Sequence, residues 1–539
     1  MRIAIAQSNQ HVGDISGNAD KVIRMLGDAR DGHRARLVVF PELAVTGYPP
    51  EDLLQRPELY RQVERALAQI AASARGIDII VGSPQSVQGR LYNCCHYLRD
   101  GTAIATYRKR VLPNYGVFDE KRHFTPGDKL CIVQVDGIPA SLSICEDLWT
   151  PEHARESAQQ GARLLININA SPYHADKQEE RKQLLAERAR ETGLAILYVN
   201  LIGGQDELVF DGGSLAIDGA GHFAFPAPQF TEGLFLMEID GTAEKLRLRG
   251  LQPDEPALGR AESVYRALTL GVRDYVLKNR FPGVVVGLSG GIDSALTLCI
   301  AVDALGAERV QALLMPSRYT SPISIEDARV LCAHMGVRHD TISVEEPFQA
   351  FTRALAPQFE GLPADATEEN IQARCRGILL MAISNKTGRM VLTTGNKSEM
   401  SVGYATLYGD MAGGFAPLKD VSKMLVYELA RWRNRNGEAI PARTIERPPT
   451  AELRPDQKDE DSLPPYPVLD PILERYVELD QSPEEVIRAG FNPATVRRVA
   501  SMVDRAEYKR RQAAPGIKIS KRAFGRDRRY PITSGYRET

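Results

Sequence analysis

A short glycine-rich loop is the first stretch of this sequence that could do chemistry. Residues 284–288 are apolar, Ser-Gly-Gly-Ile-Asp-Ser follows at 289–294, and a helical pattern starts at Asp293. Strand, glycine loop and helix N-terminus form a cradle for phosphate, because glycines let backbone N–H groups approach an anion. A carboxylate beside a polyphosphate is repulsive unless a divalent cation lies between them, so Asp293 is predicted to bind Mg²⁺. The alternative is a glycine-rich turn without a ligand, but the complete strand, loop and helix context favours Mg-ATP.

Three residues in the first half could cleave an amide. A thiol does so when a base removes its proton and a cation or N–H group stabilises the tetrahedral oxyanion. Glu42 follows an apolar run, Lys109 stands in Lys-x-x-Leu-Pro, and Cys145 ends a further apolar run. They supply one residue for each task. A cysteine in an apolar run is usually a small buried hydrophobe, and we assign that packing role to Cys94, Cys95, Cys131, Cys299, Cys332 and Cys375.

Two blocks of predicted elements position these residues. Up to about Gly241, short apolar runs alternate with segments of helical spacing, which predicts a layered α/β domain rich in strands. Runs at 283–289, 310–317, 339–344 and 390–396 alternate with helical stretches, as in a doubly wound parallel sheet that binds ligands at the carboxyl ends of its strands. We predict domains at 1–246 and 264–539 and a linker at 247–263, which is rich in proline, glycine and acidic residues.

Composition limits the class of protein. The chain has 539 residues, is 43% hydrophobic and carries a net charge of −2, so a folded globular protein is expected and a broad nucleic-acid or membrane surface is not. The N-terminal stretch lacks the features of a signal peptide, and no apolar stretch is long enough to span a bilayer. Seven cysteines without a C-x-x-C pair predict reduced thiols and a cytoplasmic location.

The second half carries a family resemblance. Its loop resembles that of the ATP pyrophosphatase group, whose members hold the β and γ phosphates and release them as pyrophosphate. With the blocks at 367–377, 392–423 and 448–466, the domain is similar to the NAD synthetase family. The resemblance implies a Rossmann-like fold and, through an adenylate, amidation of the nicotinate carboxylate of deamido-NAD.

The motifs that match assign binding residues. For ATP the matching positions are Gly287, Leu288, Ser289, Gly290, Gly291, Ile292, Asp293, Ser294, Thr394, Lys423 and Thr450. For deamido-NAD they are Asn370, Arg374, Glu399 and Lys509, and Glu399 also offers a second carboxylate for Mg²⁺. Ammonia-only synthetases tend to have lysine just before Tyr-Gly-Asp, where this chain has Leu407, so that contact stays open.

The first half resembles the nitrilase, or carbon–nitrogen hydrolase, superfamily with its Glu-Lys-Cys triad. The motifs lie at 38–53, 107–124 and 140–154. The resemblance implies an αββα sandwich, with Glu42 as general base, Lys109 as oxyanion and thiolate stabiliser, and Cys145 as the nucleophile that forms a glutamyl thioester from glutamine. For glutamine binding it points to Tyr115, Ser171 and Lys177.

Together the two halves predict an enzyme that makes NAD from deamido-NAD, ATP and glutamine, with ammonia passing from one site to the other. A homo-oligomer is expected from the resemblance of the second half to the NAD synthetase family. Two regions have alternatives: the acidic segment around 459–461 is a passive connection or a lid over ATP, and the basic tail from Glu507 binds nucleic acid or, as we favour, anionic substrates. Rival functions are an adenylating amidotransferase with another acceptor and a nucleotide-binding regulatory protein.

Overall fold

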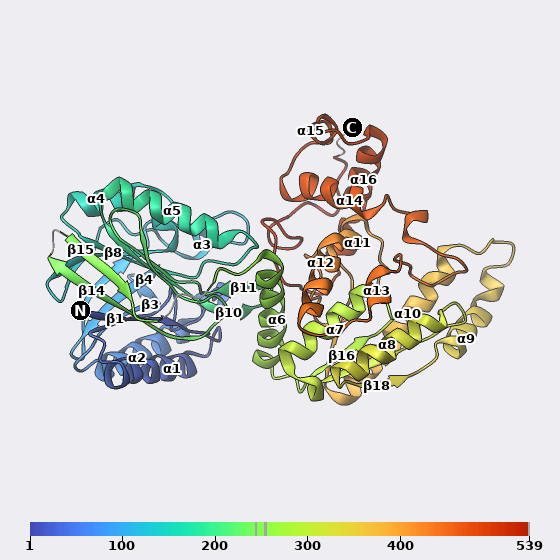
Figure 1. Ribbon diagram of the computed structural model, residues 1–539, viewed down its shortest axis with the longest axis horizontal. Helices are drawn as coiled ribbons and strands as arrows, with labels where there is room; N and C mark the ends of the chain where they lie inside the picture. Colours follow the sequence, from blue (N-terminus) through green and yellow to red (C-terminus); the bar gives the residue numbers. More distant parts are fainter. Residues whose placement is uncertain (243–244, 253–255, 537–539) are drawn as a thin grey trace. The chain divides into compact units, whose positions relative to one another are not determined.

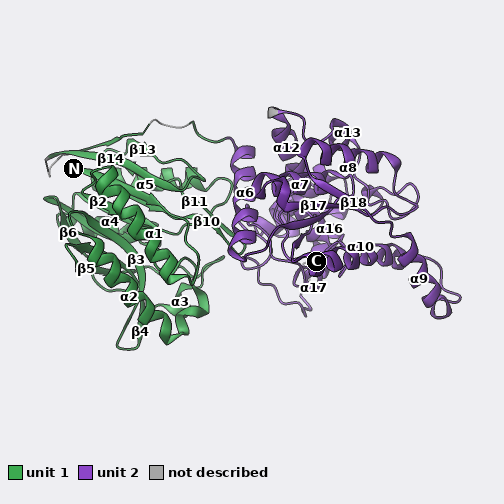
Figure 2. Cartoon of the chain, turned by 90° about the horizontal axis from the view of Figure 1, so that it is seen from below, with its two compact units in different colours: residues 1–258 green, residues 259–539 purple. Residues whose placement is uncertain are grey.

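The structure, a computed structural model, describes residues 1–242, 245–252 and 256–536. The chain divides into two compact units, Met1–Leu258 and Gly259–Thr539 (Figures 1 and 2). The observed connection between the units differs at both ends from the linker that we predicted at 247–263. Strand β15 (Lys245–Gly250) enters it because Leu246 and Leu248 pack on the core of the first unit, and α6 (Arg260–Lys278) begins before its end. Residues 253–255 of that linker lie outside the described residues.

Two β-sheets form the centre of the first unit. The larger has the strand order β15-β14-β1-β2-β3-β4-β5, the smaller has the order β13-β12-β9-β8-β7-β6, and β10 pairs with β11 in a hairpin. The strands β1, β2 and β3 are mutually parallel, as are β7, β8 and β9. The strands are β1 (Arg2–Gln7), β2 (Leu37–Val39), β3 (Asp78–Val87), β4 (Arg90–Arg99), β5 (Thr102–Arg108), β6 (Ile132–Val135), β7 (Ile138–Ile144), β8 (Leu164–Asn169), β9 (Ala195–Asn200), β10 (Ile202–Gln205), β11 (Leu208–Asp211), β12 (Leu215–Ile217), β13 (Phe223–Pro226), β14 (Gly233–Thr242) and β15.

Helices cover the outer face of each sheet, which confirms the predicted αββα sandwich (Figure 1). One core lies between the sheets, where Ile5 of β1 and Ile166 of β8 belong to the same buried cluster. A second core joins α1 and α2 to the larger sheet, and a third joins α4 and α5 to the smaller. The helices are α1 (Ile15–Gly27), α2 (Pro57–Ser73), α3 (Glu120–His123), α4 (Glu152–Gln159) and α5 (Lys177–Thr192).

The second unit is built on a four-stranded parallel sheet of order β18-β17-β16-β19, as the sequence predicted. Its strands are β16 (Val284–Gly287), β17 (Val310–Leu314), β18 (Arg338–Thr341) and β19 (Met390–Leu392). Val285 of β16 packs against Leu380 of α10, and Val284 and Val286 on the opposite face are fully buried too. Chain order reverses between β16 and β19, and a ligand site is expected beyond the carboxyl ends of strands at such a point.

Helices surround this sheet, and a helical cluster completes the unit. In the cluster α14, α16 and the segment between them bury a common core that includes Leu469, Val477 and Val499. The helices are α6, α7 (Ile292–Leu305), α8 (Pro322–Met335), α9 (Glu345–Leu355), α10 (Ala366–Thr387), α11 (Lys397–Val402), α12 (Lys423–Arg433), α13 (Ala442–Glu446), α14 (Tyr466–Leu473), α15 (Pro483–Arg488), α16 (Pro493–Arg505) and α17 (Glu507–Arg510). Among the described residues, no helix has both the length and the apolar character needed to cross a membrane.

Candidate active sites

Glu42 and Lys109 meet in the first unit as a buried ion pair. Glu42 follows β2 and Lys109 follows β5, and Lys109 Nζ lies 2.8 Å from Glu42 Oε1. Asn93 Nδ2 donates to the same oxygen at 2.7 Å, and the backbone N–H of Ala170 donates to Glu42 Oε2 at 2.9 Å. Both side chains are buried, so this geometry fixes a carboxylate and an ammonium away from water.

A second carboxylate, Glu120, joins this pair, and our sequence analysis missed it. Its Oε1 lies 2.8 Å from Lys109 Nζ and accepts a hydrogen bond from Tyr48 at 3.0 Å. Burial raises the pKa of Glu120 to about 7, with the charge of Glu42 acting in the same direction and Lys109 opposing it. Burial lowers the pKa of Lys109, but Glu120 and Glu42 outweigh it and hold that pKa above its ordinary value.

Cys145 lies at a strained turn directly after β7. Its φ of 44° is in the left-handed region, which a side chain other than glycine rarely adopts, and a 3₁₀ turn begins at this residue. Asp147 braces the turn, because its Oδ2 accepts from Ile144 N at 2.9 Å while its Oδ1 accepts from Val111 N at 2.9 Å. One buried carboxylate therefore ties the cysteine turn to the loop after Lys109.

The surroundings of Cys145 favour its protonated thiol. Burial raises its pKa well above the ordinary value, the charge of Glu42 adds to this, and Lys109 opposes it. A neutral thiol needs a base at the moment of attack, and the buried Glu42 carboxylate has the right chemistry for that. The arrangement therefore favours base-assisted attack over a preformed thiolate.

The residues predicted to contact glutamine converge on the cysteine turn. Tyr115 donates to Oε1 of Glu146, the neighbour of Cys145, at 2.8 Å. Lys177, at the first position of α5, has its Nζ 3.9 Å from the ring centroid of Trp149. Ser171 is buried and directly follows Ala170, whose N–H binds Glu42.

Removing the charge of Glu120 should change how amide hydrolysis depends on pH. When Glu120 ionises near pH 7, its negative charge holds the Lys109 ammonium that stabilises the oxyanion. Glutamine hydrolysis should therefore rise through this range. In Glu120→Gln this rise with pH should disappear. At pH values above the rise, kcat/KM should fall about tenfold, because a hydrogen bond to a charged group is lost. The measurement is kcat/KM between about pH 6 and about pH 9. Glu156→Gln, which loses only the ion pair with Arg110, is the control, and an unchanged profile for Glu120→Gln would contradict the role.

In the second unit, a cavity of about 290 Å³ opens at the switch point between β16 and β19. Of the residues predicted to bind ATP, Gly290 alone is absent from its lining. Gly290 has a φ of 84°, and a Cβ there would lie 2.2 Å from Ser324 O, so only glycine fits. The predicted residues that line the cavity are Gly287, Leu288, Ser289, Gly291, Ile292, Asp293, Ser294, Thr394, Glu399, Lys423 and Thr450.

Two carboxylates and a lysine meet in this cavity. Asn396 caps α11 by accepting from Glu399 N at 3.0 Å, and its Nδ2 donates to Asp293 Oδ1 at 2.9 Å. Lys423, the first residue of α12, forms an ion pair with Asp293, and its Nζ lies 3.6 Å from Glu399 Oε1. Burial raises the pKa of Glu399 to about 8, and the charge of Asp293 adds to the shift. We did not single out Asn396 in the sequence, although it lies in the block at 392–423.

The other residues predicted to bind deamido-NAD lie around one loop, residues 403–407. Thr406 donates to Asn370 Oδ1 at 2.7 Å, and Arg374 Nε donates to Leu407 O at 3.2 Å. Lys509 Nζ donates to the carbonyls of Gly403 and Ala405, each at 2.8 Å. Thr406 also lines the cavity, so the loop connects these three residues to it.

The acidic segment lies over the cavity. Asp459 lines it and is held by the Tyr466 hydroxyl at 2.8 Å, which favours the lid over the passive connection. Helix α14 begins at Tyr466, soon after this segment.

In the basic tail, several cations pair with carboxylates of the same unit. Lys518 pairs with Asp527 and Arg522 with Asp480. These cations therefore balance internal charge and do not form an open basic patch.

Comparison with known proteins agrees with this architecture. The Carbon-nitrogen hydrolase model matches residues 2–248 and the NAD synthase model matches residues 264–513. A glutamine-dependent NAD(+) synthetase of Xylella fastidiosa is 50% identical over 542 residues, covering 100% of this chain and 99% of its own, and that of Acinetobacter baylyi is 47% identical over 99% of both. A solved glutamine-dependent NAD+ synthetase of Acinetobacter baumannii, in complex with ADP, is 45% identical, covers 100% of this chain and 99% of its own, and has a TM-score of 0.81.

The fold and its two sites define a ligase in which a carbon–nitrogen hydrolase unit is fused to an NAD synthase unit. The chain belongs to the family of glutamine-dependent NAD+ synthetases.

Proposed function

We propose that the first unit hydrolyses glutamine and that the second unit uses the ammonia to convert deamido-NAD into NAD, with ATP going to AMP and pyrophosphate. The observation that carries this proposal is the presence in one chain of the buried Glu42–Lys109 pair beside Cys145 and of a phosphate loop that lines a cavity with two carboxylates. The ADP complex of the Acinetobacter baumannii relative supports the binding of an adenine nucleotide.

In the first step Cys145 attacks the amide carbon of glutamine. As the S–C bond forms, the thiol proton passes to Glu42 and the developing oxyanion is stabilised by the charge of Lys109. When the C–N bond breaks, the nitrogen takes that proton and leaves as ammonia. Water then attacks the glutamyl thioester with Glu42 as base, and glutamate and the free thiol are the products. We propose that Tyr115, Ser171 and Lys177 position glutamine for this sequence.

In the second step a carboxylate oxygen of deamido-NAD attacks the α-phosphorus of ATP, and pyrophosphate leaves. The loop N–H groups, the N-terminus of α7 and Lys423 are placed to stabilise charge that accumulates on the leaving phosphates. Ammonia then displaces AMP from the adenylate, which gives NAD. We propose that Thr394 and Thr450 contact ATP and that Asn370, Arg374, Glu399 and Lys509 contact deamido-NAD.

We also propose that Asp293 and Glu399 would hold Mg²⁺, which supplies charge neutralisation to the phosphates when bound. The residues fit, because burial and, after it, the charge of Asp293 raise the pKa of Glu399, and a bound cation would favour the ionised form of both carboxylates. The described part of the chain holds no cluster of three or more His, Cys, Asp or Glu side chains suited to a metal. A magnesium ion that takes its other ligands from phosphate and water needs only one or two carboxylates. A cytoplasmic location and a homo-oligomer stay proposals that the sequence arguments support.

The proposal is tested by supplying the two nitrogen donors separately. Purified protein is incubated with Mg-ATP and deamido-NAD, with glutamine in one reaction and ammonium in the other, and NAD, AMP and glutamate are followed. We expect NAD and AMP in equal amounts with either donor, and glutamate with glutamine. Glutamate without NAD or AMP would keep the hydrolase assignment and overturn the acceptor.

A further inference from the structure

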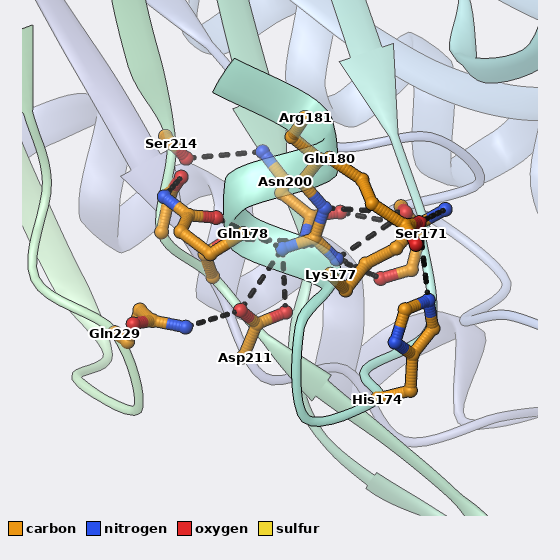
Figure 3. Close-up of polar contacts among 12 residues, drawn as sticks. Ser171, His174, Lys177, Gln178, Glu180, Arg181, Asn200, Asp211, Ser214 and Gln229 are labelled. Carbon is orange, nitrogen blue, oxygen red and sulfur yellow. Dashed lines mark hydrogen bonds and ion pairs between the residues drawn. The ribbon is translucent and has the colours of Figure 1, made fainter. Parts of the chain in front are cut away.

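Arg181 is a buried cation that none of the steps above uses. It lies on α5, and its side chain and that of Asp211, the last residue of β11, are each 0% exposed. Its Nη1 donates to both carboxylate oxygens of Asp211, at 2.8 and 2.9 Å (Figure 3). Burying two charges is costly, so a pair with such complete geometry points to a purpose beyond packing.

The other side of the guanidinium holds Ser171. Arg181 Nη2 donates to Ser171 O at 2.8 Å and to its Oγ at 3.2 Å, and Nε donates to the same Oγ at 3.4 Å. The Ser171 N–H in turn donates to Asn200 Oδ1 at 2.9 Å. Because Oγ accepts from Arg181, the hydroxyl keeps its hydrogen to donate, either to the neighbouring Tyr198 hydroxyl or to a carbonyl or carboxylate of a ligand.

Further side chains fix the orientation of Arg181. Gln229 Nε2 donates to Asp211 Oδ2 at 2.8 Å, and Gln178 Oε1 accepts from Arg181 Nη1 at 3.2 Å (Figure 3). Gln178 also donates through Nε2 to Gly213 O at 3.0 Å. The guanidinium is thus locked by groups from α5, β11 and the loops around 213 and 229.

Arg181 also acts on Lys177, one helical turn earlier on the same face of α5. Burial lowers the pKa of Lys177, and the charge of Arg181 adds to that effect. The two side chains proposed to contact glutamine from this part of the unit, Ser171 and Lys177, therefore both depend on one arginine.

We propose that Arg181, held by Asp211, is the positioning residue of the glutamine site. It presents the Ser171 hydroxyl as a donor to the substrate and fixes the first turn of α5, which carries Lys177. The inference rests on the proposed function of Ser171 and Lys177. Arg190 provides the contrast, because it is an arginine on the same helix but is exposed.

The test substitutes Arg181→Lys, which keeps the charge but loses the planar fork. We expect the KM for glutamine to rise about ten- to a hundredfold while kcat at saturating glutamine stays within about threefold, because a charge-assisted hydrogen bond network that orders the ground-state contact is lost. Synthesis from ammonium should be unchanged. Arg190→Lys, the control on the same helix, should leave the KM for glutamine as it is.

A double substitution separates positioning from general stability. If Arg181 acts through Ser171, Arg181→Lys adds little to the KM effect of Ser171→Ala, whereas it adds fully to that of Tyr115→Phe. A loss of thermal stability with an unchanged KM for glutamine would overturn the inference. Should Arg181→Lys not fold, the isosteric Asp211→Asn is measured, and an unchanged KM there has the same meaning. Unchanged KM values in both Ser171→Ala and Lys177→Ala would instead overturn the proposed glutamine site itself.

Discussion

Cys145→Ala is expected to abolish glutamine-dependent NAD synthesis and leave ammonia-dependent synthesis largely intact. The Cys145 sulfur is the protein atom that bonds to the substrate carbon in the proposed mechanism, so glutamine hydrolysis should fall on the order of a thousandfold or more. The second unit keeps its cavity and its carboxylates, because Asp293, Glu399 and Lys423 belong to another compact unit. The measurement is initial NAD formation with each donor, together with glutamate release.

The control for this substitution is Cys95→Ala. Cys95 lies on β4 in the same buried cluster as Cys145, and burial raises its thiol pKa well above the ordinary value too. Both substitutions remove one sulfur from the same core, but of the two cysteines only Cys145 lies at a strained turn near Glu42 and Lys109. Equal loss of glutamine-dependent activity in the two variants would assign the effect to packing, and loss of ammonia-dependent synthesis in Cys145→Ala would count against a separate glutaminase.

The sequence predicted those elements whose apolar pattern matches their burial. The apolar run at 283–289 was predicted as a strand and contains β16, and the run at 310–317 contains β17. Strand β4 was not predicted, because Asn93 and His96 interrupt its pattern. Both are buried polar residues with partners: Asn93 binds Glu42, and His96 contacts Ser83 Oγ at 2.9 Å. These polar residues obscure the apolar pattern of the strand. Asn93 instead contacts the candidate active site, and His96 forms a hydrogen bond within the sheet.

The candidate sites show the same difference between residues that a local pattern identifies and residues that only tertiary contacts explain. Motifs identified the residues that carry the chemistry, such as Cys145 and Asp293, because their types and spacing are specific. The residues that orient them could not be predicted, since their partners are distant in the chain. Glu120 stands in a run of charged residues that resembles a solvated helix end, and only the buried Lys109 explains why it is inside. Asp147 has a purpose only once the loop after Lys109 reaches the turn of Cys145.

The second large effect is expected for Asp293→Ala, which should suppress NAD synthesis from glutamine and from ammonium alike. Both routes share the adenylation step, and this substitution removes a proposed Mg²⁺ ligand and the ion-pair partner of Lys423. Charge stabilisation by a metal ion contributes several kcal/mol, so a loss of about a hundredfold or more is expected. The measurement is AMP and pyrophosphate formation with each donor, at increasing Mg²⁺ concentration.

Asp303 supplies the matched control, because it stands on the same helix, α7, but accepts from Tyr265 and Arg433. Asp303→Ala also removes a paired carboxylate from α7. It should keep ATP use, because the contacts that it loses are a hydrogen bond from Tyr265 of α6 and an ion pair with Arg433 of α12. In Asp293→Ala, glutamine hydrolysis should persist, which distinguishes a broken synthetase site from a misfolded chain. Unchanged ATP use in Asp293→Ala would defeat the magnesium assignment. A loss that excess Mg²⁺ partly restores would support it, because Glu399 remains to hold the cation with the phosphates.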